Sequence, residues 1–443
     1  MKNSKLIFNK DSVKCGKFIK DIKLTKMDIQ YQRYPILQNI YKCIEETGKK
    51  TNYEIIKTIK FKISETPLIF GFFNFLFETG QLEPFLEDIK SSDANIIITA
   101  IKQNNINPIL TWYQKNKKKL CRYSIWNDYL SEQIEDETFL QLVYGNIFFS
   151  PKYENLLLGK VIKKISINKN NFNINILLIN NKKPNINNLI HICTFMQKLS
   201  TKPGQKININ ILYSDFKKEF DFDSNNKLLN ESNINSGSTI PGYYINLWRS
   251  EEIDKVLIHE LIHYLYFDFK SYLTDYELFT NLISQLNVKG EIKLNEAFTE
   301  TLALIIHSVF LSYKIFMSID FLNPILNYEI NFSVFQCFKI LSFFDIGLEN
   351  IFINNAETIN QTTDVFSYFI VKTFFLLSIT DFLLFINDNL NFSERYNEFI
   401  NLIEISLSKK GYFIKLLSEF NKIKKDKTQF IWKTLRMTCL QLN

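Results

Sequence analysis

The feature that most constrains this chain is the pair His259 and His263, four positions apart, with Glu260 directly after the first. They are two of the four histidines in 443 residues. Residues at i and i+4 lie one turn apart on the same face of a helix, so both imidazoles can reach one metal ion. Glu260 would then lie beside that ion. The sequence therefore predicts a helix that carries half of a metal site.

Chance does not account for this spacing. Four histidines in 443 residues give about 0.03 expected pairs at spacing four, and requiring Glu next lowers this to roughly two in a thousand. The pattern is the HExxH zinc signature, in which the histidines bind the ion and the glutamate acts as a base. The alternative interpretation is a pair of histidines on a solvated helix surface.

Three strand-like runs precede this helix. Residues 172–178 and 207–213 are rich in β-forming residues, and 243–248 alternates as a half-buried strand does. Ser250 is a plausible N-cap, followed by two glutamates in the first turn. A zincin, the metallopeptidase fold built around an HExxH helix, needs this order of elements. In such a fold an edge strand just before the helix can hold an extended substrate by backbone hydrogen bonds.

A catalytic zinc site needs three protein ligands and an open position for water. The downstream candidates for the third ligand are Asp268, Asp275, Glu277, Glu291, Glu296 and Glu300. Metzincins continue HExxH with a glycine and a third ligand, but this chain has Tyr266 and Phe269 at those positions. That continuation is therefore absent, and Asp268 is one position away from its acidic variant.

The segment 294–300, Leu-Asn-Glu-Ala-Phe-Thr-Glu, places Glu296 and Glu300 on one helix face. It resembles the gluzincin metallopeptidases, specifically the NExxSD segment of thermolysin-like enzymes. The resemblance implies that Glu296 is the third zinc ligand and that Glu300 orients His259. Two features depart from that family. Glu300 stands where the family has Asp, and the spacer 264–295 is 32 residues long, closer to that of clostridial neurotoxin light chains. Alternatively, both glutamates face solvent on an amphipathic helix.

A wider and weaker similarity covers about residues 230–310. The run 247–256, which leads into HExxH, and residues 235–237 and 267–269 are similar to uncharacterised metallopeptidase-like proteins of large cytoplasmic DNA viruses. Abundant Asn, Lys and Ile are compatible with an AT-rich genome. The similarity supplies no substrate.

The resemblance implies a zinc-dependent peptidase with one Zn²⁺ ion. Zinc on His259, His263 and Glu296 would lower the pKa of water, and Glu260 would pass the proton to the leaving amine. The oxyanion usually needs another donor. Tyr368 is our candidate, because it begins a C-terminal helix beyond the cleft, although a tyrosine of the core or surface is the alternative.

Composition and length set the expected architecture. The chain is 46% apolar and 22% charged, so it can bury a large core and has room for two or three domains. We expect an α+β fold with a two-lobed zincin-like catalytic domain. Residues 1–160 would form a mostly helical N-terminal region of unknown role, 161–322 the core with sheet, HExxH helix and third-ligand helix, and 323–443 a C-terminal helical lobe.

Two other functions stay open. The chain could be a catalytically silent zincin-fold protein with a structural or host-factor-binding role. Alternatively, the lysine clusters at 17–26, 115–119 and 422–427 could bind nucleic acid, but the net charge of +7 is modest and acidic residues lie nearby. The basic tail 422–433 is expected to dock on its own domain.

The expected location is intracellular. The N-terminus leads into no long apolar segment, and no eighteen-residue uncharged apolar run occurs, so we expect no secretory signal and no membrane span. The substrate would then be a peptide or protein that is present in the cytoplasm, the host cytoplasm or the virion.

Overall fold

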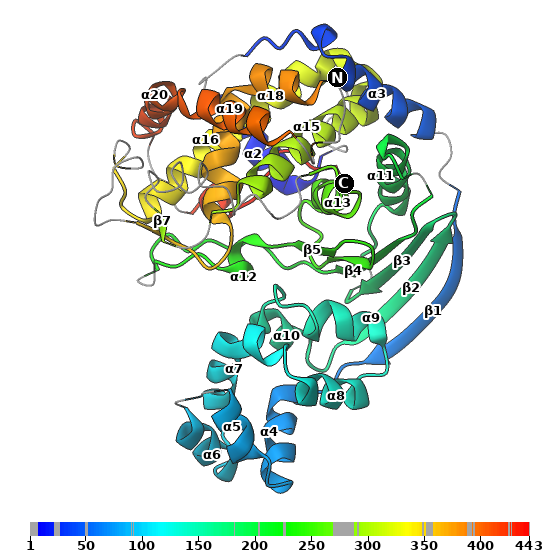
Figure 1. The fold of residues 1–443 in the computed structure, drawn as a ribbon, viewed down its shortest axis with the longest axis vertical. Coiled ribbons are helices and arrows are strands. Elements are labelled where there is room, and N and C mark those ends of the chain that lie inside the picture. The colour runs from blue at the N-terminus through cyan, green and yellow to red at the C-terminus, as the bar shows by residue number, and fades with distance from the viewer. Residues whose placement is uncertain are drawn as a thin grey trace.

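A mixed sheet of six strands lies at the centre of the described part of the molecule (Figure 1). The strands lie in the order β1-β2-β3-β4-β6-β5; β4 runs parallel to β3 and β6, and the other neighbours are antiparallel. Their bounds are Glu54–Lys62 (β1), Val161–Lys169 (β2), Phe172–Leu178 (β3), Ile207–Tyr213 (β4), Gly237–Ile240 (β5) and Tyr244–Leu247 (β6). The computed structural model describes residues 8–442 except 22–26, 49–51, 90, 92, 181, 203, 225–226, 269–287, 290–291, 348–349, 351–357, 388–391, 393–394, 424–425 and 427. The sheet and its many helices confirm the α+β class.

One face of the sheet is apolar, and the other carries a ladder of asparagines. β3 and β4 both contain Asn-Ile-Asn-Ile, and their parallel pairing places equal residues side by side. Asn175 donates from Nδ2 to Oδ1 of Asn210 at 3.1 Å, and Asn210 donates in the same way to Asn246 at 3.1 Å. Because side chains alternate between the faces, burial on one face and amide hydrogen bonds on the other both specify the strand register.

Helices cover the apolar face and share one continuous core with it (Figure 1). The helix with the histidine pair, α13, packs on β5 and β6 and contacts both α11 and α15. The helices on this face form what we call the helical body. They are α2 (Lys10–Asp21), α3 (Pro35–Gly48), α11 (Ile186–Leu199), α13 (Ile253–Tyr264), α15 (Leu294–Phe316), α16 (Leu322–Phe343), η6 (Phe366–Val371), α17 (Lys372–Leu377), α18 (Ile379–Ile386), α19 (Tyr396–Leu407) and α20 (Lys410–Phe420). The site helices are thus held between the sheet and the C-terminal helices.

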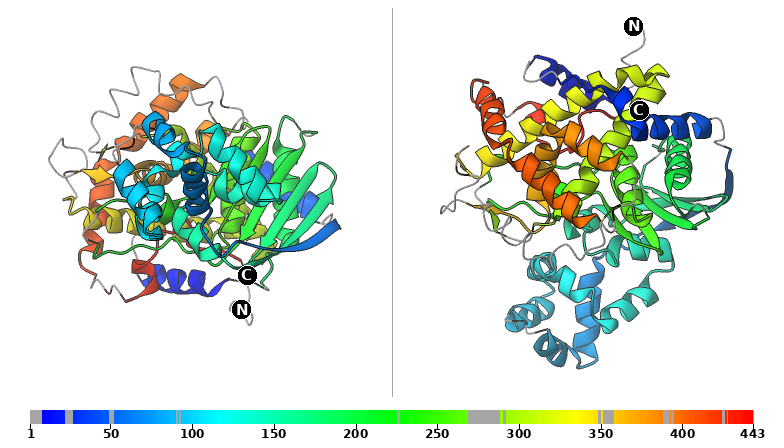
Figure 2. Two further views of the ribbon diagram at one scale, coloured as in Figure 1. Left: turned by 90° about the horizontal axis from the view of Figure 1, so that it is seen from below. Right: turned by 45° about the horizontal axis from the view of Figure 1, so that its top comes forward.

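A second hydrophobic core lies on the opposite face of the sheet, in a helical lobe formed by residues 64–160. In Figure 1 and in the right view of Figure 2, this lobe lies below the sheet and the other helices lie above it. Its helices are α4 (Leu68–Glu78), α5 (Leu82–Asp88), α6 (Ala94–Lys102), α7 (Ile106–Leu120), α8 (Ser124–Gln133), α9 (Glu137–Phe139), η2 (Leu140–Tyr144) and α10 (Pro151–Leu157). The short elements elsewhere are η1 (Tyr31–Arg33), α12 (Glu231–Ile234), β7 (Val288–Lys289), η4 (Ile319–Phe321), β8 (Ile359–Asn360) and η7 (Phe430–Trp432).

Residues 1–160 are mostly helical where the structure describes them, but β1 interrupts the helices and pairs with β2. In addition, α2 packs on α16, and α3 packs on α11 and α15. The residues of β1 are largely exposed at the end of the sheet. A strand without a buried face lacks the apolar alternation that reveals strands, which explains why the sequence does not indicate it.

Two details upstream of α13 differ from prediction. The helix begins at Ile253, and Glu252, not Ser250, takes the N-cap position with a φ of 62°. The reason is tertiary, because Glu252 is buried and accepts hydrogen bonds from a distant part of the backbone. The strand predicted over 243–248 is β6, which lies inside the sheet. The edge strand beside α13 is instead Gly237–Ile240.

The segment after α20 is buried in the helical body. Trp432 is 1% exposed, so the end of the basic tail docks on its own fold as predicted. Two buried carboxylates hold the backbone beyond it. Glu252 accepts a hydrogen bond from the N–H of Met437 at 2.7 Å, and Glu329 accepts one from the N–H of Cys439 at 2.7 Å. This segment brings Met437 next to the site described below.

One described helix, α15, is long and apolar enough to cross a membrane. The bent pair Phe366–Leu377 and Ile379–Ile386 would add a second span only if its two parts, at 90°, counted as one. Of the apolar window of α15, 89% is buried inside the protein. That burial is what a central core helix shows, so the described residues give no clear membrane span.

Candidate metal centre

The three predicted ligands meet at one point between α13 and α15. The Nε2 atoms of His259 and His263 are 3.2 Å apart, and each lies 3.5 Å from Oε2 of Glu296. Zinc with bonds of 2.0–2.1 Å in tetrahedral geometry places its ligand atoms about 3.3–3.4 Å apart. These three atoms therefore form one face of a tetrahedron of the size that zinc requires.

Helix geometry explains why the ligands converge. His259 and His263 are one turn apart on α13, which packs along α15. Glu296 lies in the first turn of α15, so its side chain faces α13 near the histidine pair. The exposed fractions of the three side chains are 8%, 17% and 16%. The site is thus sheltered but not closed.

Each histidine presents its second nitrogen to a carboxylate. Nδ1 of His259 lies 2.9 Å from Oε2 of Glu300, and Nδ1 of His263 lies 2.5 Å from Oδ2 of Asp268. A carboxylate at Nδ1 favours the proton there and leaves the Nε2 lone pair free for a metal ion. Glu300 lies where the family resemblance implies, and the longer side chain still reaches the imidazole.

Asp268 was considered from the sequence only as a ligand, and the structure places it behind His263 instead. α13 ends at Tyr264, and Tyr266 has a φ of 58°. The N–H of Phe267 bonds back to the carbonyl of Ile262 at 2.9 Å, the pattern of a helix end that reverses the chain. That reversal returns Asp268 to the helix. A non-glycine residue in this conformation leaves no clear sequence signal.

Two buried lysines surround Glu300. Lys255, one turn before His259, forms a close ion pair with Oε2 of Glu300, and Nζ of Lys372 lies 3.7 Å from Oε1. Burial raises the pKa of Glu300, but Lys255, His259 and Lys372 together lower it far below its usual value. Glu300 therefore stays ionised beside His259. The sequence does not indicate either lysine.

Glu260 lies against the edge strand β5. Its Oε2 accepts a hydrogen bond from the hydroxyl of Thr239 at 2.7 Å. A Cβ atom at Gly237 would lie 2.4 Å from Oε1 of Glu260, so glycine is needed for this close approach. Burial raises the pKa of Glu260, even though the imidazoles of His259 and His263 oppose the change.

Tyr368 reaches the same site from the C-terminal helices. Its Oη donates a hydrogen bond to Oε2 of Glu296 at 3.0 Å, and its ring centroid lies 5.9 Å from that of His259. Tyr368 belongs to η6, which packs on α15. Burial and the neighbouring Glu296 carboxylate raise the pKa of its phenol well above the usual value. The phenol is therefore a permanent donor at neutral pH.

The three candidate ligands shift one another's pKa values. Burial lowers the pKa of His263, but Asp268 and Glu296 outweigh it and hold that pKa well above its usual value. Burial raises the pKa of Glu296, but His263 and His259 outweigh it and hold that pKa well below its usual value. The three side chains together therefore favour a positive charge at the point where they meet.

One further histidine of the described residues lies outside this cluster. His307 is fully buried in the core. Asp275, Glu277 and Glu291 lie outside the described residues.

Comparison with known proteins supports a viral relationship. The chain is 27% identical over 278 residues to an uncharacterized protein of Acanthamoeba polyphaga mimivirus, and the match covers 58% of this chain and 70% of that protein. No family model matches the chain, and no solved structure matches it significantly. The chain is therefore similar to a mimivirus protein.

Proposed function

We propose that this protein is a zinc-dependent peptidase of the gluzincin type, with a zincin-like catalytic domain. One observation carries the proposal. Three ligand atoms from two helices lie 3.2–3.5 Å apart, and the second nitrogen of each histidine faces a carboxylate. A pair of solvated surface histidines would have neither feature. Two histidines and one glutamate with an open fourth position are the ligand set of zinc peptidases.

His259, His263 and Glu296 would hold the ion. Bound there, zinc would supply Lewis acidity, which lowers the pKa of water and polarises a carbonyl group. Glu260 would take the proton of the attacking water and deliver it to the leaving amine. The Thr239 hydroxyl fixes one of its oxygens, and burial raises its pKa towards the range in which a carboxylate exchanges protons readily.

Tyr368 would donate a hydrogen bond from Oη to the oxyanion that develops on the substrate. Its Oη already lies beside a ligand oxygen of Glu296. Its raised pKa keeps the proton available for donation.

The edge of β5 would hold the substrate as an added strand. Among the described strands β5 pairs with β6 alone, and the Gly237 and Thr239 positions of β5 adjoin Glu260. A peptide paired with β5 would therefore run past the metal centre. The mimivirus relative supports a place of action inside a host cell or a virion.

Metal content and peptide hydrolysis test this proposal together. The wild-type protein should contain about one zinc ion per chain. Glu260→Gln should keep the zinc and lose roughly 100- to 10,000-fold in hydrolysis of a peptide library. Tyr368→Phe should also keep the zinc and lose about 100- to 1,000-fold in kcat.

A wild-type protein without stoichiometric metal would end the proposal. If zinc is bound but wild type and Glu260→Gln act alike on every substrate, the protein is a catalytically silent scaffold. Salt-dependent DNA binding in place of hydrolysis would favour a nucleic-acid function.

A further inference from the structure

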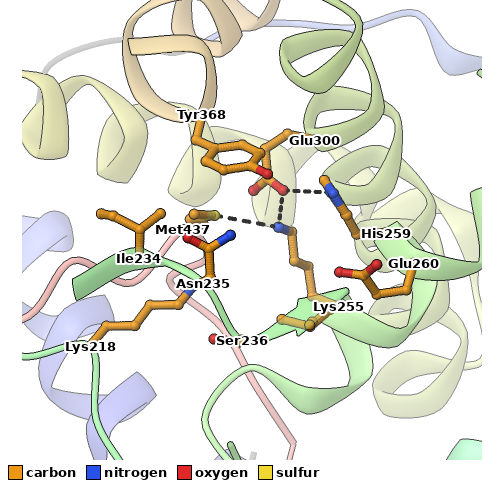
Figure 3. Close-up of a pocket in the computed structure, with 12 residues that line it drawn as sticks. Lys218, Ile234, Asn235, Ser236, Lys255, His259, Glu260, Glu300, Tyr368 and Met437 are labelled. Atoms are coloured by element: carbon orange, nitrogen blue, oxygen red, sulfur yellow. Dashed lines mark hydrogen bonds and ion pairs between the residues drawn. The ribbon is translucent and has the colours of Figure 1, made fainter. Parts of the chain in front are cut away.

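A small cavity adjoins the metal centre beside β5 and the C-terminal segment (Figure 3). Its walls include Glu260 and His259, so a group bound in it would lie next to the scissile bond. The cavity measures about 30 Å³, two to three times what a single water molecule requires. It can therefore take a small polar group but not a large side chain.

Two buried ammonium groups belong to this cavity. Lys218 and Lys255 line it, and both side chains are 1% exposed. Lys218 pairs with Glu252 at 2.7 Å, and Lys255 pairs with Glu300. Among the described residues neither Nζ has a second oxygen partner, although an ammonium has three N–H donors. Figure 3 shows Lys218 reaching towards Asn235 and Lys255 reaching Glu300. Both lysines retain donors for a ligand.

The carboxylates around the cavity are already matched. Glu300 faces two lysines, Lys255 and Lys372. Glu252 has Lys218 and backbone N–H groups as partners. Glu260, the other carboxylate in the wall, is held by a hydroxyl of β5. The three lysines and the three carboxylates thus balance in number, and what remains for a ligand is the set of ammonium N–H donors that the carboxylates do not use.

Ser236 supplies an independent sign of a missing partner. The residue is 5% exposed, it lines the cavity, and its Oγ has no hydrogen-bond partner among the described residues. The neighbouring Asn235 accepts a hydrogen bond at Oδ1 from Thr363, which leaves its amide N–H groups as donors. A ligand that accepts hydrogen bonds would satisfy these groups together.

We propose that this cavity binds a carboxylate of the substrate next to the scissile bond, either an Asp or Glu side chain or the terminal carboxylate of a peptide. The inference rests on the proposed peptidase function. Two ammonium groups, a hydroxyl and an amide N–H are complementary to a carboxylate, and hydrogen bonds between charged groups are the stronger kind. A basic group would be repelled by the two ammonium groups, and a neutral acceptor would make only the weaker kind of hydrogen bond with them.

Matched peptides test the proposal. Each position flanking the cleavage site is occupied by Glu or Gln, and each peptide is made with a free or an amidated C-terminus. Wild type should favour the carboxylate roughly 10- to 100-fold in kcat/KM, the range expected for a charge-assisted hydrogen bond. Preference for internal Glu indicates a side chain, and preference for the free end indicates the terminal carboxylate. Equal cleavage of all peptides by an active enzyme would overturn the carboxylate site and leave the peptidase function intact.

The double variant Lys218→Met, Glu252→Gln removes one cation together with its partner, so no buried carboxylate is left alone. Its preference for the carboxylate should fall at least about threefold below that of wild type. Ser236→Ala, the smallest change, should weaken the preference in the same direction. An unchanged preference in both variants would overturn the proposal. If the double variant does not fold, Ser236→Ala decides alone.

A binding measurement decides even if no peptide is hydrolysed. Calorimetric titration of the purified protein with glutarate, compared with neutral glutaramide, reports carboxylate binding directly. The affinity for glutarate should fall about tenfold in the double variant. If glutarate instead bound only to the zinc ion, its affinity would be the same in both proteins. Equal glutarate affinity in wild type and double variant would overturn the carboxylate site.

Discussion

Two buried lysine–glutamate pairs, one in each hydrophobic core, differ in how fully their ammonium groups are used. In the lobe, Nζ of Lys117 donates to the carbonyls of Val143 and Phe149, both at 2.7 Å, and to Glu154 at 2.5 Å. The hydroxyl of Tyr113 adds a contact with Glu154 at 3.3 Å. All three N–H donors of this lysine are therefore occupied.

The pair in the helical body is arranged differently. Lys255 bonds to Glu300, and its other contact is the Sδ of Met437 at 3.9 Å. The same Glu300 oxygen lies 2.9 Å from Nδ1 of His259. One carboxylate thus serves a lysine and a candidate metal ligand, and the lysine keeps donors that face a cavity.

The difference separates an ion pair whose hydrogen bonds are complete from one that has donors left. A buried charge is costly unless its hydrogen bonds are satisfied. Lys117 and Glu154 are satisfied within the lobe, so they need no ligand. Lys255 and Glu300 are only partly satisfied, and buried charges left in that state concentrate at functional sites.

The largest expected effect concerns the lobe. Lys117→Met should lower the free energy of unfolding of the lobe by about 3–5 kcal/mol, because Glu154 would remain as an uncompensated buried charge. Urea unfolding followed by tryptophan fluorescence measures it, since Trp112 and Trp126 lie in this core. The control Lys117→Met, Glu154→Leu should recover most of the loss. Zinc content should not change in either folded variant. A change would show that the Lys117–Glu154 pair affects the candidate metal site.

The second effect concerns the ligand set. Glu296→Gln should weaken zinc binding by more than about 100-fold, beyond the range for residues that only orient a ligand. Asp268→Asn should weaken it about tenfold, because it removes the carboxylate behind His263 and not a ligand. Competition with a chelator gives both affinities. The reverse order would show that Asp268 binds the metal.

A third effect tests whether the helical body also holds buried polar groups without hydrogen-bond partners away from the candidate metal site. Neither ring nitrogen of His307 has a partner among the described residues, and burial, aided by Lys255, lowers its pKa to about 3. Between pH 6.5 and 3 the unfolded chain therefore binds a proton that the folded chain does not, so stability falls as pH falls. Because of this histidine, the free energy of unfolding should fall by about 2 kcal/mol between pH 7 and pH 5.

His307→Leu should remove this acid sensitivity. Urea unfolding of wild type and variant at pH 7 and pH 5 measures the difference. An equal loss of unfolding free energy in the two proteins would mean that protonated His307 is stabilised in the fold, by a hydrogen-bond partner or by water.

The smallest effect sharpens the comparison of the two lysines. Lys255→Met should lower zinc affinity by up to about tenfold, because Glu300 would orient His259 less firmly. Lys372 remains to hold Glu300 ionised. Chelator competition on the folded variant, with Lys117→Met as the matched control, measures it. Equal zinc affinity in both variants would show that Lys255 does not act through Glu300.

The sequence by itself determined the parts of this protein that depend on short-range periodicity. Strands β3 and β4 have the predicted bounds. The spacing of His259 with His263, and of Glu296 with Glu300, placed each pair on one helix face, because a helix returns to the same side every three to four residues. Family resemblance then paired the two helices, and the structure brings those side chains together. Tyr368, inferred only from its place beyond the cleft, lies there as well.

Only the tertiary structure decided what surrounds the candidate ligands. Asp268 returns to His263 through a chain reversal at a non-glycine residue. Lys255 and Lys372 meet at Glu300, and Gly237 of β5 makes room for Glu260. The contacts of Glu300 and Gly237 join segments that are distant in the chain, whereas Asp268 reaches His263 only because the chain reverses. Nothing in the local sequence marks any of these contacts. Helix periodicity acts within a few residues, whereas the partners of a buried charge depend on how whole elements pack.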